Sequence, residues 1–300
     1  IGSDYVFEVD IPPTVAVACS HCGVARDLYA WLVQNGHATS LHRPSTADFV
    51  VDNEELPVQI QVEQTEACPG YCALTLTGCE VKESPEWLQN KLRVIGLRPI
   101  NNIVDITNYV CLEYGQPMHA FDFSCVDGGK IVVRTAREGE TVQTLDGNER
   151  KLTTNMLCIC DEHKPVCVAG VMGGANSEIV GDTAMVLFES ANFNGVSVRR
   201  TAAALGMRTD ASARYEKGLD PMNTMKAVQR ACELVELLGC GEVVDGVMDV
   251  IAKDAYPTTV KLEPEKVNAL LGTNVSEEEM RRILLSLDFG LDGDTILVPS

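Results

Sequence analysis

The sequence predicts a mixed α+β protein with a β-rich subregion near its middle and smaller units on either side. Two regular helices are indicated at 84–96 and 220–239, where apolar residues recur at three- and four-residue spacing up to a glycine. Between them, short runs of β-branched residues alternate with turn signals. With 300 residues, 45% of them hydrophobic, the chain is long enough for about two domains.

The N-terminal segment is expected to be a small αβ piece, too short for a core of its own. Tyr5 to Asp10 alternate as in a strand, Pro12-Pro13 ends that run, and Cys22 to Val33 have a helical pattern. The polar, proline-bearing stretch from Asn35 to Pro44 is typical of a linker.

The first long helix is predicted to begin after Ser84, which has the character of an N-cap followed by proline in the first helical position. Leu88, Leu92 and Ile95 then share one face. Gly96 is expected to end this helix.

The β-rich subregion contains three predicted strands, at Ile131–Val133, Thr141–Val142 and Met156–Cys160. The turn Asp146-Gly147-Asn148 separates the second strand from the third. The second long helix follows Asp220-Pro221 and ends at Gly239. Its apolar face comprises Met225, Val228, Cys232, Val235 and Leu238.

A separate C-terminal unit is predicted after Ala255-Tyr256-Pro257. It begins with a strand at Thr259–Leu262 and a helix at Pro264–Leu271. A capping box at Ser276 and Glu279 opens a further helix. The buried face of that helix comprises Met280, Ile283, Leu284 and Leu287. Because the chain opens at Ile1 and stops at Ser300 directly after a strand-like run, we expect both ends to be cut.

Composition limits the class of function. A net charge of −19 argues against wide coating of a nucleic-acid backbone, so any RNA contact is expected to be local, and no DNA partner is expected. The sequence has no run of 18 apolar residues and no signal-peptide pattern, which indicates a cytoplasmic protein without a membrane partner. The 12 cysteines are spread along the chain, so we expect reduced thiols.

Cysteine spacing alone leaves a metal site open as an alternative. Cys19 and Cys22 have a zinc-like spacing, and Cys68 and Cys72 form a second candidate pair. The second pair has a three-residue gap and no matching partner signal, so no metal site is expected.

Four ordered blocks resemble the editing domain of the phenylalanyl-tRNA synthetase beta subunit family, bacterial type. They are Val104 to Val110, Gly115 to Asp122, Ala169 to Gly174, and Leu187 to Ala191 continued by Arg208 to Gly218. The resemblance implies three parts: the end of a preceding beta-subunit module at 1–39, the editing domain at 40–253, and the start of a truncated winged-helix-like module at 254–300.

The resemblance also implies a function, the hydrolysis of tyrosine wrongly attached to phenylalanine tRNA. The partners would be the 3′ acceptor end of that tRNA, tyrosine, and a synthetase alpha subunit in a heterotetramer formed by the complete beta chain. ATP and magnesium are implied for the complete enzyme, and no cofactor for this fragment. Since the sequence contains no P-loop and none of the class II synthetase motifs, the fragment is not expected to aminoacylate tRNA.

The proofreading logic predicts a buried acceptor for the tyrosine hydroxyl. An apolar site for phenylalanine rejects tyrosine, which adds a hydroxyl, by only ~10²-fold. A site that hydrogen-bonds this hydroxyl rejects phenylalanine, which lacks it, by ~10⁴-fold or more. Glu189 is the expected acceptor, because a carboxylate ends the apolar run Met185–Phe188. The resemblance implies that Gly170 and Gly173 line the ring end of the pocket and that Ala211 leaves room beside it.

Four residues are implied at the ester end by the same resemblance: His119, Thr107, Asn108 and Thr209. Hydroxyl, amide and imidazole groups can orient a water and support a developing oxyanion. His119 is a candidate general base, although the sequence indicates no carboxylate that would orient it as in a catalytic triad. Activation of the water by protein or by a tRNA hydroxyl stays open. Arg199, Arg200, Arg208 and Arg214 are expected to meet acceptor-end phosphates.

Taken singly, each of these residues also has a purely structural interpretation. Glu189 suits a solvated strand end, His119 a satisfied and partly buried histidine, and the glycines of 170–174 a turn. The arginines suit a solvated helix face. The alternative function is accordingly a non-catalytic RNA-binding or scaffold module of the synthetase, and a small-molecule enzyme built on a borrowed fold is the third.

Overall fold

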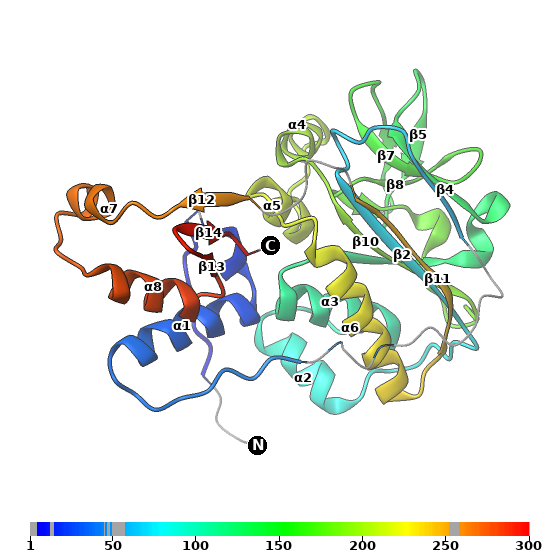
Figure 1. Cartoon of the computed structure of the whole chain (residues 1–300). Helices are drawn as coiled ribbons and strands as arrows, with labels where there is room; N and C mark the ends of the chain where they lie inside the picture. Colours follow the sequence, from blue (N-terminus) through cyan, green and yellow to red (C-terminus); the bar gives the residue numbers. More distant parts are fainter. Residues whose placement is uncertain are drawn as a thin grey trace.

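The computed structural model describes residues 5–12, 15–44, 46, 49, 58–251 and 258–299. It confirms the α+β class: helices and several sheets are segregated into layers (Figure 1). The helices are α1 (His21–Gln34), α2 (Glu86–Val94), α3 (Asn102–Tyr114), α4 (Gly195–Leu205), α5 (Asp210–Glu216), α6 (Asn223–Leu238), α7 (Pro264–Leu271) and α8 (Glu277–Ser286).

Among the described residues the strands form four sheets. A five-stranded sheet has the order β1 (Gln59–Val62), β4 (Lys130–Thr135), β7 (Leu157–Cys160), β8 (Pro165–Val168), β9 (Met172–Gly173). A four-stranded sheet has the order β11 (Glu242–Ile251), β2 (Gly70–Thr77), β10 (Val186–Asn192), β3 (Met118–Asp122). The smaller sheets are β12 (Thr259–Lys261), β14 (Thr295–Leu297), β13 (Gly290–Asp292), and the hairpin β5 (Thr141–Gln143), β6 (Glu149–Lys151).

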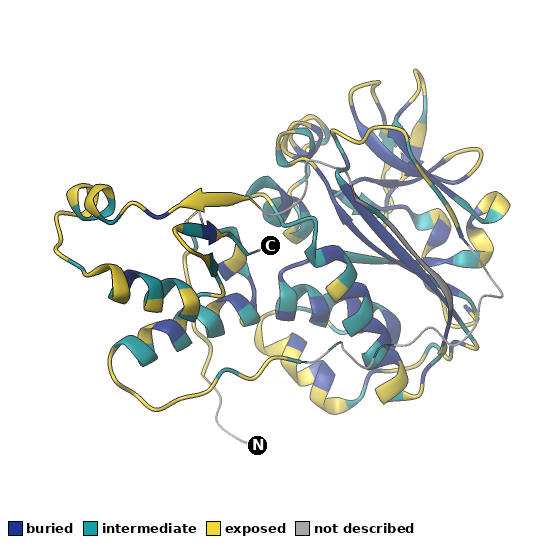
Figure 2. Cartoon of the chain, viewed as in Figure 1, coloured by how far each residue is buried: buried dark blue, intermediate teal, exposed yellow. Residues whose placement is uncertain are grey.

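The four-stranded sheet is the central layer, and each of its faces contributes to a different core. Tyr71, Phe121 and Leu187 point toward the five-stranded sheet, where they pack in one cluster with Val133 and Ile159. The alternate residues of the same strands, such as Leu74 and Phe188, pack against α2, α3 and α6. Figure 2 shows most residues of β2, β10 and β3 as buried.

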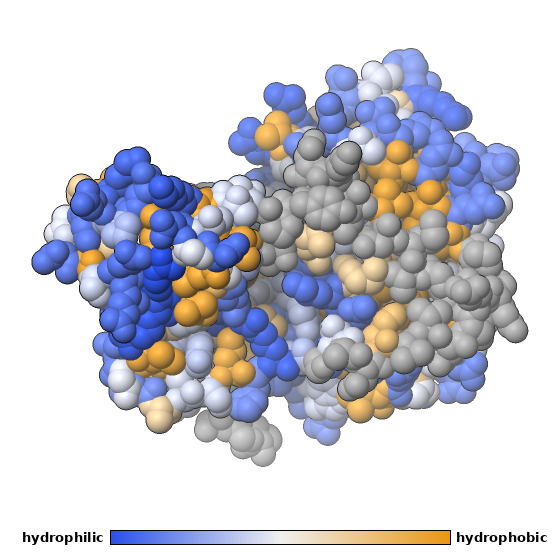
Figure 3. Space-filling view, in the orientation of Figure 1, coloured by the Kyte–Doolittle hydropathy of each residue, from blue (hydrophilic) through white to orange (hydrophobic). Residues whose placement is uncertain are grey.

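The C-terminal unit has its own small core. Leu262, Met280 and Ile296 are its buried apolar residues. Its surface in Figure 3 is mostly hydrophilic, with smaller hydrophobic patches, and α8 packs beside α1 (Figure 1). The order strand, helix, helix, strand, strand is established. Its identification as a winged-helix-like module, and the domain boundaries at 39/40 and 253/254, stay predictions; residue 253 lies outside the described residues.

The long helices and the β-rich subregion are confirmed. Helix α6 ends at Gly239 in the left-handed conformation, and α7 has the predicted bounds. The predicted turn lies in the β5–β6 hairpin, where Gly147 has φ +79°. The segment Ala255-Tyr256-Pro257, predicted to open the C-terminal unit, lies outside the described residues.

Three local predictions are wrong. Residues 5–10 form no strand, because the described chain places no strand beside them to complete their backbone hydrogen bonds. Ser84 does not cap α2, whose N-cap is Pro85: the Ser84 hydroxyl donates to the buried Asp105 carboxylate at 2.6 Å, and this bond orients the side chain toward Asp105 and not toward the helix amides. At α8, Ser276 accepts from the Glu279 amide, but the Glu279 carboxylate pairs with Arg282 instead of closing the capping box.

Candidate active site

A small pocket lies where the four-stranded sheet faces the β8–β9 hairpin and α5. Its volume is about 110 Å³. An engineered apolar cavity of ~150 Å³ binds benzene, so the pocket has the size of one aromatic ring. Its lining residues are Pro117, Met118, His119, Ile159, Cys167, Gly170, Val171, Met172, Gly173, Glu189, Phe193, Ala211 and Tyr215.

Glu189 is the acidic group of this pocket. It lies within β10, a strand whose residues are all buried, directly opposite His119 on β3 and Ala73 on β2. Directly opposed residues of antiparallel strands share a face, so Glu189 points into the pocket beside the imidazole. Glu189 is only 4% exposed to solvent. Burial raises the pKa of Glu189 to about 8, with no charged partner offsetting this effect.

His119 is partly buried and neutral. Burial lowers the pKa of its imidazole to about 4, and the ring packs edge-on against Phe121 at 4.5 Å between centroids. Its buried Nε2 has no hydrogen-bond partner among the described residues. The ring is therefore held by packing, with a nitrogen available to a water or a substrate.

The β8–β9 hairpin brings its glycines against the pocket. Gly170 has φ +68°, and a Cβ there would lie 2.9 Å from the Val198 side chain. At Gly173 a Cβ would lie 2.8 Å from Nε2 of His119. Both positions therefore need glycine, the first for backbone conformation and the second for close approach to the imidazole.

Helix α5 forms the facing wall through Ala211 in its first turn. Thr209 caps this helix: its hydroxyl accepts from the Ser212 amide and donates to the Val171 carbonyl at 2.8 Å. Thr209 is thus not a lining residue of the pocket. It ties α5 to the hairpin that carries Gly170 and Gly173.

Helix α3 carries the remaining residues expected at the ester end. Thr107 is buried and its hydroxyl donates to the Val104 carbonyl within the helix at 2.7 Å. Asn108 is partly buried. Neither lines the pocket as the structure has it. The structure therefore brings together His119, Glu189, Gly170, Gly173 and Ala211, and leaves Thr107 and Asn108 outside their pocket.

The four arginines expected to bind RNA differ in exposure. Arg199 and Arg200 are exposed on α4, and Arg208 is exposed just before α5. Arg214 is partly buried on α5, where one guanidinium nitrogen donates to the Asp210 carbonyl at 3.3 Å and the buried Nε has no partner among the described residues.

Sequence reasoning missed several wall residues. Tyr215 follows Ala211 by four residues, and this spacing alone places both on one helix face. Its hydroxyl donates to the Ala191 carbonyl at 2.8 Å, and its ring packs on Phe193 at 5.2 Å. Cys167 also lines the pocket, and burial raises the pKa of its thiol well above the usual value. No local signal marks Cys167, because only the packing of the five-stranded sheet against the four-stranded sheet brings β8 near β10.

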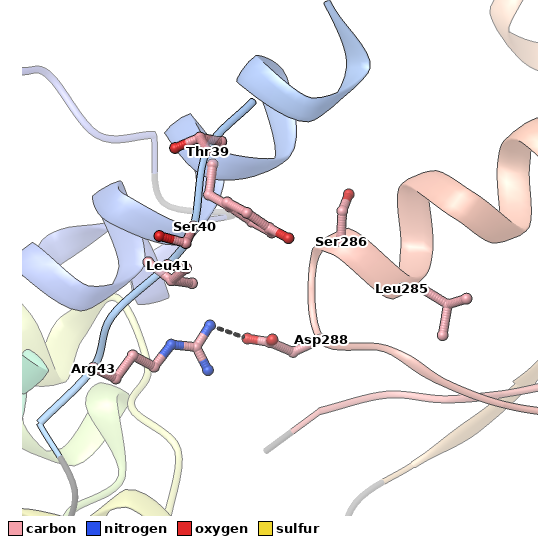
Figure 4. Close-up of a pocket in the computed structure, with 8 residues that line it drawn as sticks. Thr39, Ser40, Leu41, Arg43, Leu285, Ser286 and Asp288 are labelled. Atoms are coloured by element: carbon pink, nitrogen blue, oxygen red, sulfur yellow. Dashed lines mark hydrogen bonds and ion pairs between the residues drawn. The ribbon is translucent and has the colours of Figure 1, made fainter. Parts of the chain in front are cut away.

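A second, larger cleft lies between the N-terminal and C-terminal units. Its volume is about 700 Å³, and Tyr29, Arg43, Leu285 and Asp288 are among its lining residues (Figure 4). The Arg43–Asp288 ion pair at 2.6 Å is about 40% exposed on both sides. The ionisable residues that line this cleft, Tyr29, Arg43 and Asp288, are not buried, and exposed pairs contribute little, so the chemistry points to the smaller pocket.

Other classes of site are not indicated by the described residues. They contain no group of three or more histidine, cysteine or carboxylate side chains placed to hold a metal ion. All 12 cysteines are free thiols. None of the described helices has the length and apolar character needed to cross a membrane.

Comparison with known proteins gives a consistent result. The family model described as "B3/4 domain" matches residues 67–240. A phenylalanine-tRNA ligase beta subunit of Bacteroides fragilis is 48% identical over 304 residues, which cover 100% of this chain and 37% of that protein. The equivalent subunit of Porphyromonas gingivalis is 47% identical, with 96% and 35% covered. That of Geobacter metallireducens is 43% identical, with 95% and 35% covered.

The chain therefore spans little more than a third of the length of these relatives. Solved structures that match include an N-terminal fragment of the phenylalanyl-tRNA synthetase beta subunit from Pyrococcus horikoshii. It is 14% identical with a TM-score of 0.44, and the match covers 95% of this chain and 78% of that one.

Proposed function

This chain belongs to the B3/4 domain family, and on that premise we propose that the pocket between its sheets hydrolyses tyrosine from phenylalanine tRNA. The observation that carries the proposal is the juxtaposition of a buried carboxylate, Glu189, with a neutral imidazole, His119, in a pocket the size of one aromatic ring. A ring-sized apolar pocket with one buried polar group selects an aromatic side chain that carries a hydroxyl.

In this proposal the two polar groups have separate tasks. Glu189 hydrogen-bonds the phenol, so phenylalanine leaves the buried carboxyl group unpaired and is rejected. Nε2 of His119, which has no partner among the described residues, positions or deprotonates the water that attacks the ester carbonyl. Thr209 fixes the glycine hairpin through Val171, while Thr107 and Asn108 on α3 support the terminal ribose.

The wider assignment follows from similarity to phenylalanine-tRNA ligase beta subunits. We place the chain in a cytoplasmic beta subunit that binds the 3′ acceptor end of phenylalanine tRNA and assembles with an alpha subunit. ATP and magnesium serve the synthetic reaction of the complete ligase.

The test is release of tyrosine from tyrosyl-tRNA specific for phenylalanine, compared with release of phenylalanine from the correctly charged tRNA. The wild-type chain is expected to prefer tyrosine by ~10³-fold or more, and Glu189→Ala by less than ~10-fold. His119→Ala should slow release of tyrosine ~10²-fold or more. The matched control His163→Ala, at an exposed histidine, should behave as wild type.

The competing function, a non-catalytic RNA-binding or scaffold module, predicts a different result. If tyrosine is released only at the spontaneous rate, even with full-length subunits present, the hydrolase is excluded and the RNA-binding or scaffold function takes its place.

A further inference from the structure

We propose that Tyr71 is a positioning residue for Glu189: its hydroxyl donates to one carboxylate oxygen and leaves the other directed at the phenol of the substrate. The inference rests on the proposed function, because it specifies how the hydroxyl-recognising group is oriented. It concerns a side chain that lies behind the pocket wall and is not one of the lining residues.

The strand register places the two side chains on one face. In the β2–β10 pair, Ala73 is opposite Glu189 and Tyr71 is opposite Ala191. Tyr71 is thus the diagonal neighbour of Glu189, and diagonal Cβ atoms lie ~7–8 Å apart, within reach of long side chains. Both belong to the sheet face that packs toward the five-stranded sheet, where Tyr71 is 0% exposed.

The Tyr71 hydroxyl is buried and has no hydrogen-bond partner among the described residues. Buried hydroxyls without a partner are rare, because they have lost their bonds to water without replacement. Glu189 lies on the same sheet face, and burial alone, without a charged partner, raises its pKa. The Tyr71 hydroxyl is therefore placed to donate to this carboxyl group when the pocket is occupied.

Elimination of the other donors supports Tyr71. Burial raises the pKa of Tyr71, and its neighbouring ionisable groups are Glu189, Cys68, Cys167 and Tyr215, with no cation among them. The Tyr215 hydroxyl already donates to the Ala191 carbonyl. Thiols are weak donors, and the two cysteines already contact backbone carbonyls. Nε2 of His119 also lies beside Glu189, but the proposed function assigns it to the attacking water. Apart from that imidazole, the Tyr71 hydroxyl is the strongest donor left beside the carboxylate.

A hydrogen bond from Tyr71 would also decide the protonation state of Glu189. Donation to the ionised carboxylate favours that form over the neutral acid. As a carboxylate, Glu189 then accepts a hydrogen bond from the phenol at neutral pH. In its absence burial keeps the acid protonated, and the geometry of recognition is lost.

The test is Tyr71→Phe, which removes one oxygen and keeps the ring. We expect tyrosine release from the mischarged tRNA to fall about tenfold, as for loss of a hydrogen bond to a charged group. The pH at which selectivity for tyrosine reaches half its maximum should rise, because the donor that favours the ionised carboxylate is gone. In a Glu189→Gln background the same substitution should have almost no effect.

Ser190→Ala is the matched control. Ser190 is also fully buried with an unpartnered hydroxyl, but alternation along β10 places it on the opposite face from Glu189. Equal behaviour of Tyr71→Phe and Ser190→Ala, in rate and pH profile, would overturn the inference. So would a Tyr71→Phe protein that loses its cooperative thermal unfolding together with its activity, since the hydroxyl would then be structural. Absence of tyrosine release by wild type would instead overturn the proposed function.

Discussion

At residue 189, burial and ionisation oppose each other. A carboxylate in an apolar wall loses its hydration, and burial raises the pKa of Glu189 to about 8. Burying this carboxyl group therefore destabilises the folded chain. An apolar side chain at the same position would pack without that cost. Such a conflict is typical of a functional position rather than of a structural one.

The cost of burying Glu189 has a defined pH dependence. The pKa of Glu189 is about 8 in the folded chain against an ordinary value of 4.5, so between these values the folded chain binds more protons than the unfolded chain. The contribution of Glu189 to the free energy of unfolding is fully present below about pH 4.5 and is lost as pH rises through about 8. Glu189→Gln should therefore be more stable than wild type at pH 8, by roughly 1–4 kcal/mol relative to their difference at pH 5.

Urea unfolding of both proteins at pH 5 and pH 8 measures this difference. Other groups, including His119, are common to the two proteins and cancel in the comparison. Glu178→Gln, at an exposed carboxylate, serves as the control and should match wild type at both pH values. A Glu189→Gln difference that does not change with pH would show that the carboxylate is hydrated in the folded chain.

Part of this pocket could be predicted at the residue scale. Glu189 stood out because a carboxylate interrupts an apolar strand pattern, and the glycines stood out because they are close together. Cys167 and Tyr71 gave no such signal, because an apolar environment suits a thiol or a tyrosine ring in any core. Their relation to Glu189 depends on strand register, which a single sequence does not specify.

At the scale of elements, helix α5 holds the pocket closed from one side. Thr209 has two tasks there, capping the helix at Ser212 and donating to the Val171 carbonyl in the β8–β9 hairpin. Backbone hydrogen bonds from Val171 to Val168 and from Gly174 to Val166 close this hairpin, which turns at Gly170 with a positive φ. The Thr209 hydroxyl therefore couples the helix N-terminus to the hairpin glycines.

Thr209→Val tests this coupling while keeping the shape of the side chain. Loss of the cap should lower the free energy of unfolding by ~1–2 kcal/mol. Tyrosine release should fall further than stability alone explains, because the hairpin loses its tie to α5. Thr209→Ser keeps the hydroxyl and should restore most of both properties. If thermal unfolding and tyrosine release show Thr209→Val unchanged, the hydroxyl holds neither the helix nor the hairpin.

Elements with a strong local signal were predictable, and those set by pairing were not. Helix α6 followed from its apolar spacing and the glycine at its end. The strand expected at Tyr5–Asp10 failed because alternation describes a strand only where a neighbouring strand exists. Ser84 failed as a cap because a distant residue, Asp105, takes its hydroxyl. In both cases the tertiary structure overrode the local pattern: residues 5–10 have no neighbouring strand in the described chain, and Ser84 bonds to a distant residue.

At the scale of the whole molecule, the pocket is a product of topology. The order β11-β2-β10-β3 joins in one sheet strands that are far apart in the sequence: β2, β3 and β10 lie within the matched region 67–240, and β11 follows it. One face of this sheet packs on helices and the other on a second sheet, so Glu189 lies between layers and not at a solvated edge. The α+β class was predictable from the sequence, whereas this layering depends on long-range pairing.

The charge of the molecule limits how tRNA can bind. With a net charge of −19, tRNA binding is expected to rely on a local basic surface. The candidates are the exposed Arg199 and Arg200 on α4, the exposed Arg208 before α5, and the partly buried Arg214 within α5. Each phosphate contact contributes ~0.7 to the slope of log K against log salt for a single strand. Four arginines therefore predict a slope of about 3 in magnitude, small for a nucleic-acid-binding protein.

The double variant Arg199→Ala/Arg200→Ala should reduce the slope by about 1–2 and weaken binding at low salt, since both exposed guanidinium groups lose their phosphates. Tyrosine selectivity should stay at the wild-type value, because neither residue lines the pocket. Arg93→Ala is the control, because this exposed arginine lies on α2, across the sheet from the pocket. Dissociation constants for phenylalanine tRNA over a series of KCl concentrations give the slopes. An equal slope for the wild type and the double variant would place the tRNA on another surface of the molecule.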